Sequence, residues 1–382
     1  MDEASRRDRH LFGPGPKRIL ALDGGGVRGA ISIAFLERLE AVLDGAAGRE
    51  VRLCDHFDLI GGTSTGAIIA TALALGFRAS DIRAFYEELA PRVFYKPFYR
   101  LVGLQAKFDS RRLRAELERV IGPRRLDSED LQTGLAVILK RMDTGSSWIV
   151  MNNPRSIFWN TPPDGAFHGN REIALVNLVR ASAAAPHYFD PELIEVTPAA
   201  PPGLFVDGGL TPHNNPSLML LMHALLPQYG LNWRTGPEEL TVVSIGTGSF
   251  RPRLSAAQAR RSGAIGLAIA SLAAQISDNQ NLVLMLMSWL GQGSQDWPVN
   301  SEVGSLADTA PPFGHLFRFL RYDIVLDADW LKASLGEEVD AQQVALLRHM
   351  DRPANIPLAY RLATKAAARQ VDPADWPIAG AS

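Results

Sequence analysis

Cysteine is nearly absent from this sequence, because Cys54 is the single one among 382 residues. One thiol cannot form an intramolecular disulfide, nor can it build a metal site from several thiolates. Low cysteine usage is typical of a protein from a reducing cytoplasm, and we expect a cytoplasmic protein in which Cys54 fills a place in the core.

A dominant charge of one sign is also missing. The 39 lysines and arginines nearly balance the 41 aspartates and glutamates, which leaves a formal net charge of −2. Binding to nucleic acid needs a basic face, so nucleic acid is not an expected partner. The N-terminal residues are charged where an export signal would have roughly 7–15 apolar residues. We expect residues 1–16 to form a flexible tail.

No apolar run reaches the about 18–20 residues that span a bilayer. The nearest approach is residues 262–293, which the polar cluster 277–281 interrupts. Buried core helices are the favoured interpretation, and an interfacial or lid-like surface is the alternative. The alternative would bring transient, peripheral contact with the inner face of the membrane, because four arginines stand just upstream: Arg251, Arg253, Arg260 and Arg261.

What the sequence does contain is an alternation of strands and helices. Six short apolar runs are typical of buried strands, at residues 18–22, 57–61, 136–140, 148–152, 204–208 and 240–246. Segments with helical period lie between them, at residues 30–43, 67–75, 110–121 and 172–184. The alternation predicts a layered α/β domain over residues 17–250 with a largely parallel central sheet. Residues 251–382 are expected to be mainly helical and packed on this domain, as a lid or a regulatory region.

The glycine-rich stretch "DGGGVRG", Asp23–Gly29, follows the first predicted strand. Its glycines satisfy G-x-G-x-x-G, the fingerprint of a dinucleotide-binding loop. That fold also needs an acidic residue at the carboxyl end of the second strand, but the candidate Asp58 stands at the beginning of it. A nucleotide-binding switch protein is therefore the disfavoured alternative.

The second strand ends instead in "GTSTG", Gly62–Gly66, which contains G-x-S-x-G. On a sharp turn from strand to helix, this motif holds the serine hydroxyl exposed, as a nucleophile requires. Carboxyl ends of neighbouring parallel strands meet at one edge of a sheet, so Ser64 and the glycine loop should share a crevice.

The glycine loop then has a chemical purpose. The N–H groups of Gly24, Gly25 and Gly26 can point at the oxygen that becomes negative when Ser64 attacks a carbonyl. One such donor stabilises the transition state by roughly 3–4 kcal/mol. Arg28 would add positive potential at the same place.

A serine nucleophile also needs a base within hydrogen-bonding reach. Asp207 ends an apolar run and two glycines follow it, which places its carboxylate at a strand end beside the expected crevice. His213 and His223 come later in the chain, but no histidine stands at a clear strand-end turn. We therefore interpret the histidines as structural and Asp207 as the base. The aromatic stretch 92–103 is expected either to line an acyl channel or an interfacial lip, or to pack in the core.

At this point the chain resembles the patatin-like phospholipases. The resemblance covers roughly residues 17–216 and rests on four pieces in the family's order: "DGGGVRG" (Asp23–Gly29), "GTSTG" (Gly62–Gly66), "ASAAAPHYFDP" (Ala181–Pro191) and "DGG" (Asp207–Gly209). The third piece is expected to pack closely against the helix of the nucleophile, with a packing role for Ser182.

The resemblance implies a three-layer α/β/α sandwich whose substrates are membrane or storage lipids. It implies a Ser64–Asp207 dyad without histidine, and an oxyanion loop formed by Gly24, Gly25, Gly26 and Arg28. The expected function is a phospholipase A-type acyl hydrolase that works through an acyl-enzyme and needs no metal or other cofactor. A general esterase or thioesterase acting on soluble esters is the alternative. A small effector or a second copy of the chain is a further expected partner, with the region after residue 250 as the gate.

Overall fold

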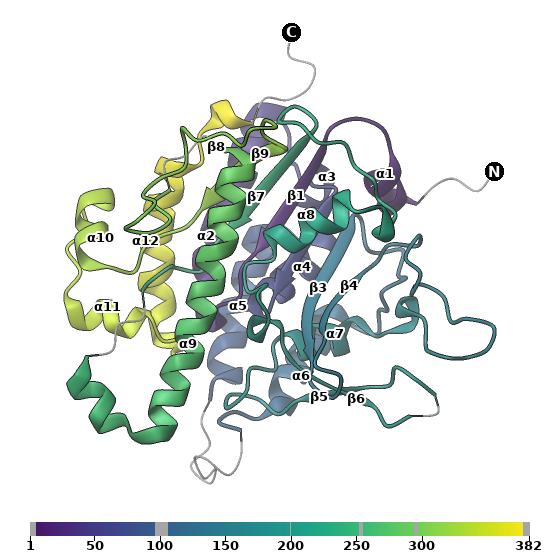
Figure 1. Ribbon diagram of the computed structural model, residues 1–382, viewed down its shortest axis with the longest axis horizontal. Coiled ribbons are helices and arrows are strands. Elements are labelled where there is room, and N and C mark those ends of the chain that lie inside the picture. Colours follow the sequence, from purple (N-terminus) through teal and green to yellow (C-terminus); the bar gives the residue numbers. More distant parts are fainter. Residues whose placement is uncertain (1–4, 96–105, 199, 252–254, 294–296, 377–382) are drawn as a thin grey trace.

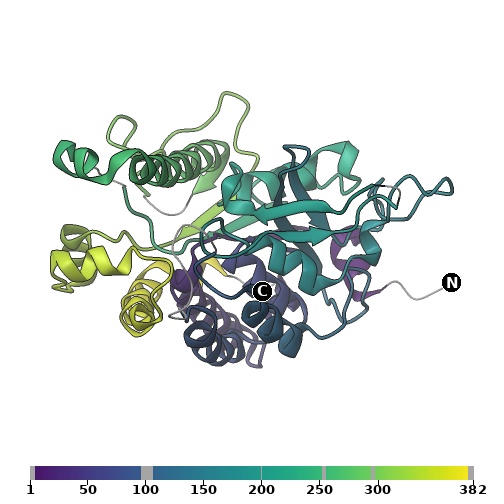
Figure 2. The ribbon, with the colours of Figure 1, turned by 90° about the horizontal axis from the view of Figure 1, so that it is seen from below.

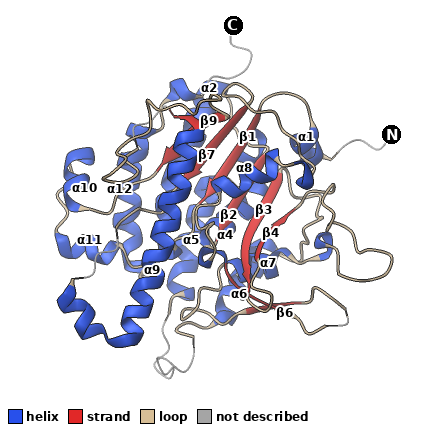
Figure 3. Ribbon diagram, viewed as in Figure 1, coloured by secondary structure: helices blue, strands red, loops and turns tan. Residues whose placement is uncertain are grey.

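A mixed nine-stranded sheet forms the centre of the molecule (Figure 1; Figure 3). The computed structural model describes residues 5–95, 106–198, 200–251, 255–293 and 297–376. The strand order is β5-β6-β3-β2-β1-β7-β9-β8, and β4 pairs with β3. The strands are β1 (Lys17–Leu22), β2 (Leu59–Thr63), β3 (Gly134–Arg141), β4 (Ser147–Met151), β5 (Glu192–Ile194), β6 (Gly203–Asp207), β7 (Leu240–Ile245), β8 (Gly291–Gly293) and β9 (Phe317–Tyr322).

The central strands are parallel and the strands at one end are not. β3, β2, β1, β7, β9 and β8 run parallel to their neighbours in this row, whereas β4, β5 and β6 pair antiparallel. Strands β1, β2 and β7 are almost wholly buried and consist largely of aliphatic residues and glycine. Continuous apolar runs of this kind are what a parallel sheet covered on both faces requires.

Helices cover both faces of the sheet (Figure 2). One layer contains α2, α4, α5, α6, α7 and α12, and the other contains α8 and α9. The predicted three-layer α/β/α sandwich is thus confirmed. The helix bounds are α1 (Arg6–Phe12), α2 (Gly29–Ala47), α3 (Leu53–His56), α4 (Thr65–Ala74), α5 (Ala79–Val93), α6 (Ser110–Ile121), α7 (Leu175–Ser182), α8 (Ser217–Leu225), α9 (Ala256–Leu290), α10 (Ala328–Leu335), α11 (Ala341–Leu347) and α12 (Ile356–Gln370).

All six predicted strands are present, as β1, β2, β3, β4, β6 and β7. The helical pattern after residue 250 is also present, but β9 lies within this region and pairs with β7 in the central sheet. The sequence "FRFLRY" of β9 does not read as a buried strand because two arginines interrupt it. Arg321 is nevertheless buried, since the carboxylates of Asp23 and Asp323 lie 2.8 Å from its guanidinium.

The expectation of a flexible tail is corrected for residues 5–16. Helix α1 lies in this segment, with Ser5 as its N-cap and Leu11 fully buried. The imidazole Nδ1 of His10 lies 3.0 Å from a carboxylate oxygen of Asp58. Polar and charged residues that suggested a solvated tail therefore help to hold α1 against the domain, through His10 with Asp58 and Arg6 with Asp55. Residues 1–4 lie outside the described part of the chain.

Helix α9 has both a buried face, as a core helix would, and exposed leucines, as an interfacial surface would. Its residues Val283, Leu284 and Met287 are buried against the sheet, whereas Leu267, Leu272 and Leu282 are exposed. No helix in the described residues is long and apolar enough to cross a membrane. Of the four arginines upstream, Arg253 lies outside the described residues.

Candidate active site

Ser64 stands on a sharp turn between β2 and α4. Its backbone has φ 56° and ψ −122°, a conformation that residues with a side chain rarely adopt. Glycine is required on both sides, because a Cβ on Gly62 would lie 2.1 Å from the carbonyl oxygen of Gly66. A Cβ on Gly66 would lie 2.2 Å from the carbonyl oxygen of Leu22. Backbone strain of this kind, on a strand-to-helix turn, is typical of a nucleophile elbow.

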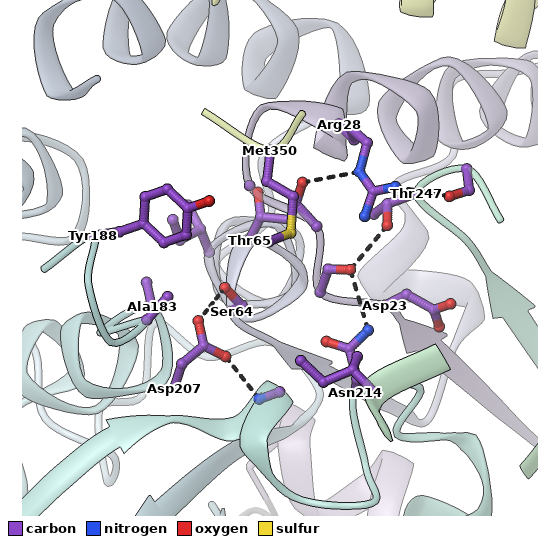
Figure 4. A pocket seen from close by; sticks show the side chains of 18 of the residues that line it. Asp23, Arg28, Ser64, Thr65, Ala183, Tyr188, Asp207, Asn214, Thr247 and Met350 are labelled. Atoms are coloured by element: carbon purple, nitrogen blue, oxygen red, sulfur yellow. Dashed lines mark hydrogen bonds between the residues drawn. The ribbon is translucent and has the colours of Figure 1, made fainter. Parts of the chain in front are cut away.

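The structure brings Ser64 and Asp207 together (Figure 4). The hydroxyl of Ser64 donates a hydrogen bond of 2.6 Å to Oδ2 of Asp207. The other carboxylate oxygen, Oδ1, accepts a hydrogen bond of 2.7 Å from the N–H of Gly209. Burial raises the pKa of Asp207 to about 6, although both hydrogen bonds act to lower it. The carboxylate is therefore a stronger base than one in water, and it stays mostly ionised at neutral pH.

Asp207 is the last residue of an antiparallel strand, and this strand brings its side chain to Ser64. β6 pairs antiparallel with β3, and Asp207 lies opposite Leu139. β3 runs parallel to β2, whose last residue Thr63 pairs with Ile138. The end of β6 therefore meets the carboxyl end of β2, although the two strands run in opposite directions.

Ser64 and Asp207 line a common pocket, and no histidine among the described residues lines it. The backbone carbonyl of His213 accepts a hydrogen bond from Thr63, so its main chain supports the elbow. His223 lies against Tyr229, with ring centroids 3.7 Å apart, and bonds the carbonyl of Met219. Burial lowers the pKa of both histidines.

The three predicted loop glycines line the pocket, but their N–H groups differ. The N–H of Gly24 donates to the carbonyl of Asn214, at 3.1 Å. Those of Gly25 and Gly26 have no partner in the described part of the chain. Gly26 has φ 58°, and a Cβ there would lie 2.2 Å from the carbonyl oxygen of Met350. The available donors are therefore the N–H groups of Gly25 and Gly26.

Arg28 also lines the pocket, and it is buried. Its guanidinium donates to the carbonyl of Gly248 at 3.0 Å and lies 5.1 Å from the ring centroid of Phe250. Burial lowers the pKa of Arg28 to about 10, so the side chain remains protonated at neutral pH. It places a positive charge at the end of the glycine loop.

Ser182 has a part in the site that its predicted packing role did not include. Its hydroxyl accepts a hydrogen bond of 2.9 Å from the N–H of Ser64 and donates one of 2.6 Å to the carbonyl of Ile138. The side chain is fully buried. Ser182 therefore fixes the backbone of the elbow. The signal in the sequence is the one hydroxyl in an otherwise small and apolar segment, "ASAAAP".

The pocket around these residues is largely apolar. It is partly open to solvent, and its cavity volume is about 180 Å³. Apolar side chains from α4, α5 with its C-cap residue, α6 and the segment after α7 line one part of it: Ile68, Leu89, Val93, Phe94, Leu113 and Phe189. Phe250 and residues of α9, including Ala273 and Ile276, line another part. The aromatic stretch 92–103 thus contributes Val93 and Phe94, and its residues from 96 on lie outside the described part.

Comparison with known proteins identifies the family. The family model described as "Patatin-like phospholipase" matches residues 20–221. A "cGAMP-activated phospholipase" of Vibrio cholerae serotype O1 is 30% identical over 264 residues, which are 65% of this chain and 70% of that protein. A "cUMP-AMP-activated phospholipase" of Escherichia coli is 29% identical over 61% of this chain and 65% of its own length. "Patatin-like protein 1" of Arabidopsis thaliana is 29% identical over 65% of this chain and 63% of its own length. The chain belongs to the patatin-like phospholipase family.

Proposed function

We propose that the protein hydrolyses acyl ester bonds of phospholipids, as a phospholipase A-type enzyme with Ser64 as nucleophile and Asp207 as base. The observation that carries this proposal is the hydrogen bond of 2.6 Å between the two side chains, at a strained elbow in an apolar pocket. Family membership supports the same reaction class.

The reaction has two acyl-transfer steps. As the Ser64 Oγ bonds to the ester carbonyl carbon, Asp207 takes the hydroxyl proton and the carbonyl oxygen becomes negative. Collapse of this intermediate breaks the ester C–O bond, and the leaving alkoxide takes the proton from Asp207. Water then attacks the acyl-enzyme, with Asp207 again accepting the proton. Fatty acid leaves, and Ser64 recovers its hydrogen.

The oxyanion is stabilised in each step by the N–H groups of Gly25 and Gly26, with the charge of Arg28 nearby. Each well-aimed donor in a dry site contributes roughly 3–4 kcal/mol to transition-state stabilisation. Gly24 serves this site through its backbone position, because its own N–H is bonded to Asn214.

The apolar lining favours a lipid over a soluble ester. Acyl chains would displace water from the side chains that α4, α5 and α6 contribute, and so keep Asp207 in a dry environment. The exposed leucines of α9 stand on the helix whose other residues line the pocket, so they would meet a lipid surface near its mouth.

We further propose that a cyclic dinucleotide activates the enzyme. The names of the Vibrio and Escherichia relatives support this, as do contacts between the glycine loop and the chain's last third. The N–H of Val27 donates to the carbonyl of Met350 at 2.8 Å, and Gln280 of α9 donates to Asp23 at 3.3 Å. Movement of this region would alter the loop directly.

The decisive experiment combines active-site labelling with lipid hydrolysis. A fluorophosphonate probe, followed by peptide mass spectrometry, should label Ser64 in the wild type and fail in Ser64→Ala. Release of fatty acid from phospholipid vesicles should disappear in the same variant, and Ser146→Ala in the exposed β3–β4 turn is the control. Labelling at another serine would overturn the assignment. Each assay is run with and without cGAMP or cUMP-AMP, using AMP as the control, and a fast rate that neither compound changes would overturn the proposed gating.

A further inference from the structure

The carbonyl of Gly24 is held by a residue from the far side of the sequence. The hydroxyl of Thr247 donates a hydrogen bond of 2.8 Å to it, and the side chain is buried. The pairing of β1 with β7 brings the two together, because Leu22 lies opposite Ile245 and the same offset puts Gly24 beside Thr247. In Figure 4, dashed lines join both Thr247 and Asn214 to this carbonyl oxygen.

This hydrogen bond determines where the next N–H points. The peptide unit is planar and trans, so its C=O and N–H point in opposite directions. When the Gly24 carbonyl is fixed toward Thr247, the N–H of Gly25 must point the other way. This is one of the two N–H groups with no partner in the described residues.

The fit between Thr247 and the loop is close. A Cβ on Gly25 would lie 2.3 Å from Oγ1 and 2.9 Å from Cγ2 of Thr247. The amide of Asn214 also donates to the Gly24 carbonyl, but at 3.4 Å. Thr247 therefore supplies the shorter of the two side-chain hydrogen bonds and the packing surface for Gly25.

The backbone on both sides of this contact is anchored by one buried ion cluster. Arg321 pairs with Asp23, which precedes Gly24, and with Asp323. Asp323 in turn accepts a hydrogen bond of 2.8 Å from the N–H of Gly248, which follows Thr247. Loss of the Thr247 hydroxyl would leave these ion pairs and the Gly248 hydrogen bond in place, so the fold should persist. The Gly24–Gly25 peptide would no longer be held in its orientation.

We propose that Thr247 is a positioning residue that aims the Gly25 N–H at the oxyanion. The proposal rests on the proposed function, because it needs an oxyanion formed by attack of Ser64. It gives a catalytic purpose to a residue beyond the segment 20–221 that the family model matches. Thr247 lines the same pocket, but its hydroxyl is bonded to the Gly24 carbonyl, so its effect on the reaction passes through the loop and the Gly25 N–H.

The test compares Thr247→Val with Thr247→Ser and with a matched control. Valine keeps the shape of threonine and removes the hydroxyl, whereas serine keeps the donor. Thr133→Val is the control, because the buried hydroxyl of Thr133 also donates to a backbone carbonyl, that of Phe57 at 2.6 Å. Thr133 stands just before β3, at the end of the strand opposite to Ile138, which pairs with Thr63 next to the elbow.

Thr247→Val should lower kcat by about ten- to a hundredfold and change KM by less than about twofold, since the lost aim acts only in the transition state. Affinity for an acyl trifluoromethyl ketone, which forms an oxyanion on the serine, should fall in parallel. Affinity for an unreactive ether analogue of the lipid should not. Thr247→Ser should restore most of kcat, and Thr133→Val should leave it unchanged.

Unchanged kcat in Thr247→Val would overturn the inference, as would an equal loss in Thr133→Val or a failure of Thr247→Ser to restore activity. The thermal unfolding midpoint of each variant shows whether a lower kcat comes from loss of the folded state or from a misoriented Gly25 N–H. Full activity in Ser64→Ala would instead overturn the proposed function itself, so the two failures are distinguishable.

Discussion

The Oγ atom of Ser64 and the Oδ2 atom of Asp207 lie 2.6 Å apart, although 143 positions separate the two residues in the chain. The contact joins a strained turn after β2 to the end of an antiparallel strand. Asp207 also accepts a hydrogen bond from Gly209, so one carboxylate oxygen is kept for the serine and the other is tied to the backbone.

Replacement of Asp207 by asparagine should abolish most turnover. The amide oxygen can still accept the hydrogen bond from Gly209, so the fold should survive, but the amide cannot take a proton from Ser64. Loss of general-base catalysis lowers kcat by about 100- to 10,000-fold. Asp164→Asn, at an exposed turn, is the control. Substantial activity in Asp207→Asn would assign the base to another group.

The same substitution should change how stability depends on pH. Burial raises the pKa of Asp207 from 3.8 to about 6, so the folded state keeps a proton that the unfolded chain loses between these values. Stability therefore decreases as pH rises from about 4 to 6, at a total cost of about 3 kcal/mol at most. Asp207→Asn removes this cost, and denaturant unfolding should show its advantage over wild type growing across that window. A constant difference from pH 3 to 8 would contradict the shifted pKa.

Activity should rise with pH through the same range. Because the base must be ionised, kcat/KM should increase with pH with a midpoint near 6, and it should level off about one pH unit above that midpoint. The measurement is the rate on a short-chain ester from pH 4.5 to 8, with labelling by the fluorophosphonate probe followed in parallel. A rate that is already constant from pH 4.5 upward would mean that water reaches Asp207.

Gly26→Ala should remove activity. It should also destabilise the protein by more than the cost of placing alanine at a positive φ. Gly26 has φ 58°, and its Cβ would collide with the carbonyl of Met350 at 2.2 Å. Gly145→Ala is the matched control, since Gly145 has φ 73° and open space around its Cβ. We expect the control to lose about 1 kcal/mol and retain full activity. Equal losses of stability in the two variants would show that the loop and the segment around Met350 separate easily.

Leu282→Ser should separate lipid hydrolysis from ester hydrolysis. Leu282 on α9 is 50% exposed, and a lipid surface would bury it. The rate on phospholipid vesicles should fall several-fold, while the rate on a soluble short-chain ester stays the same. Leu193→Ser on β5 is the control, because Leu193 is 60% exposed at the opposite end of the sheet. Equal effects on both substrates would favour a general esterase.

The sequence predicts the parts of the site whose signals are local. Ser64 stands in a five-residue motif, and Asp207 follows an apolar run with two glycines behind it, so both could be named before any coordinates. The hydrogen bond between Ser64 and Ser182 and the one between Thr247 and Gly24 could not, because each joins segments more than a hundred residues apart. Nothing near either residue in the chain indicates its partner.

Charged residues are the reason why the sequence patterns did not predict two of the elements. Helix α1 and strand β9 both contain arginines, which in isolation suggest solvent. Arg6 pairs with Asp55, and Arg321 pairs with Asp23 as well as with the nearby Asp323, so one carboxylate of each arrangement lies far away in sequence. Periodicity cannot reveal a buried charge whose counter-ion comes from another part of the chain.

The buried pairing of Asp23 with Arg321 also limits how the protein can be dissected. A recombinant fragment ending near residue 250 would retain the nucleophile and the base, yet it would lack β9 and leave the Asp23 carboxylate stranded without its guanidinium. Anyone who grafts this hydrolase into a fusion, or trims it for crystallisation, should therefore carry β9 along with the catalytic motifs.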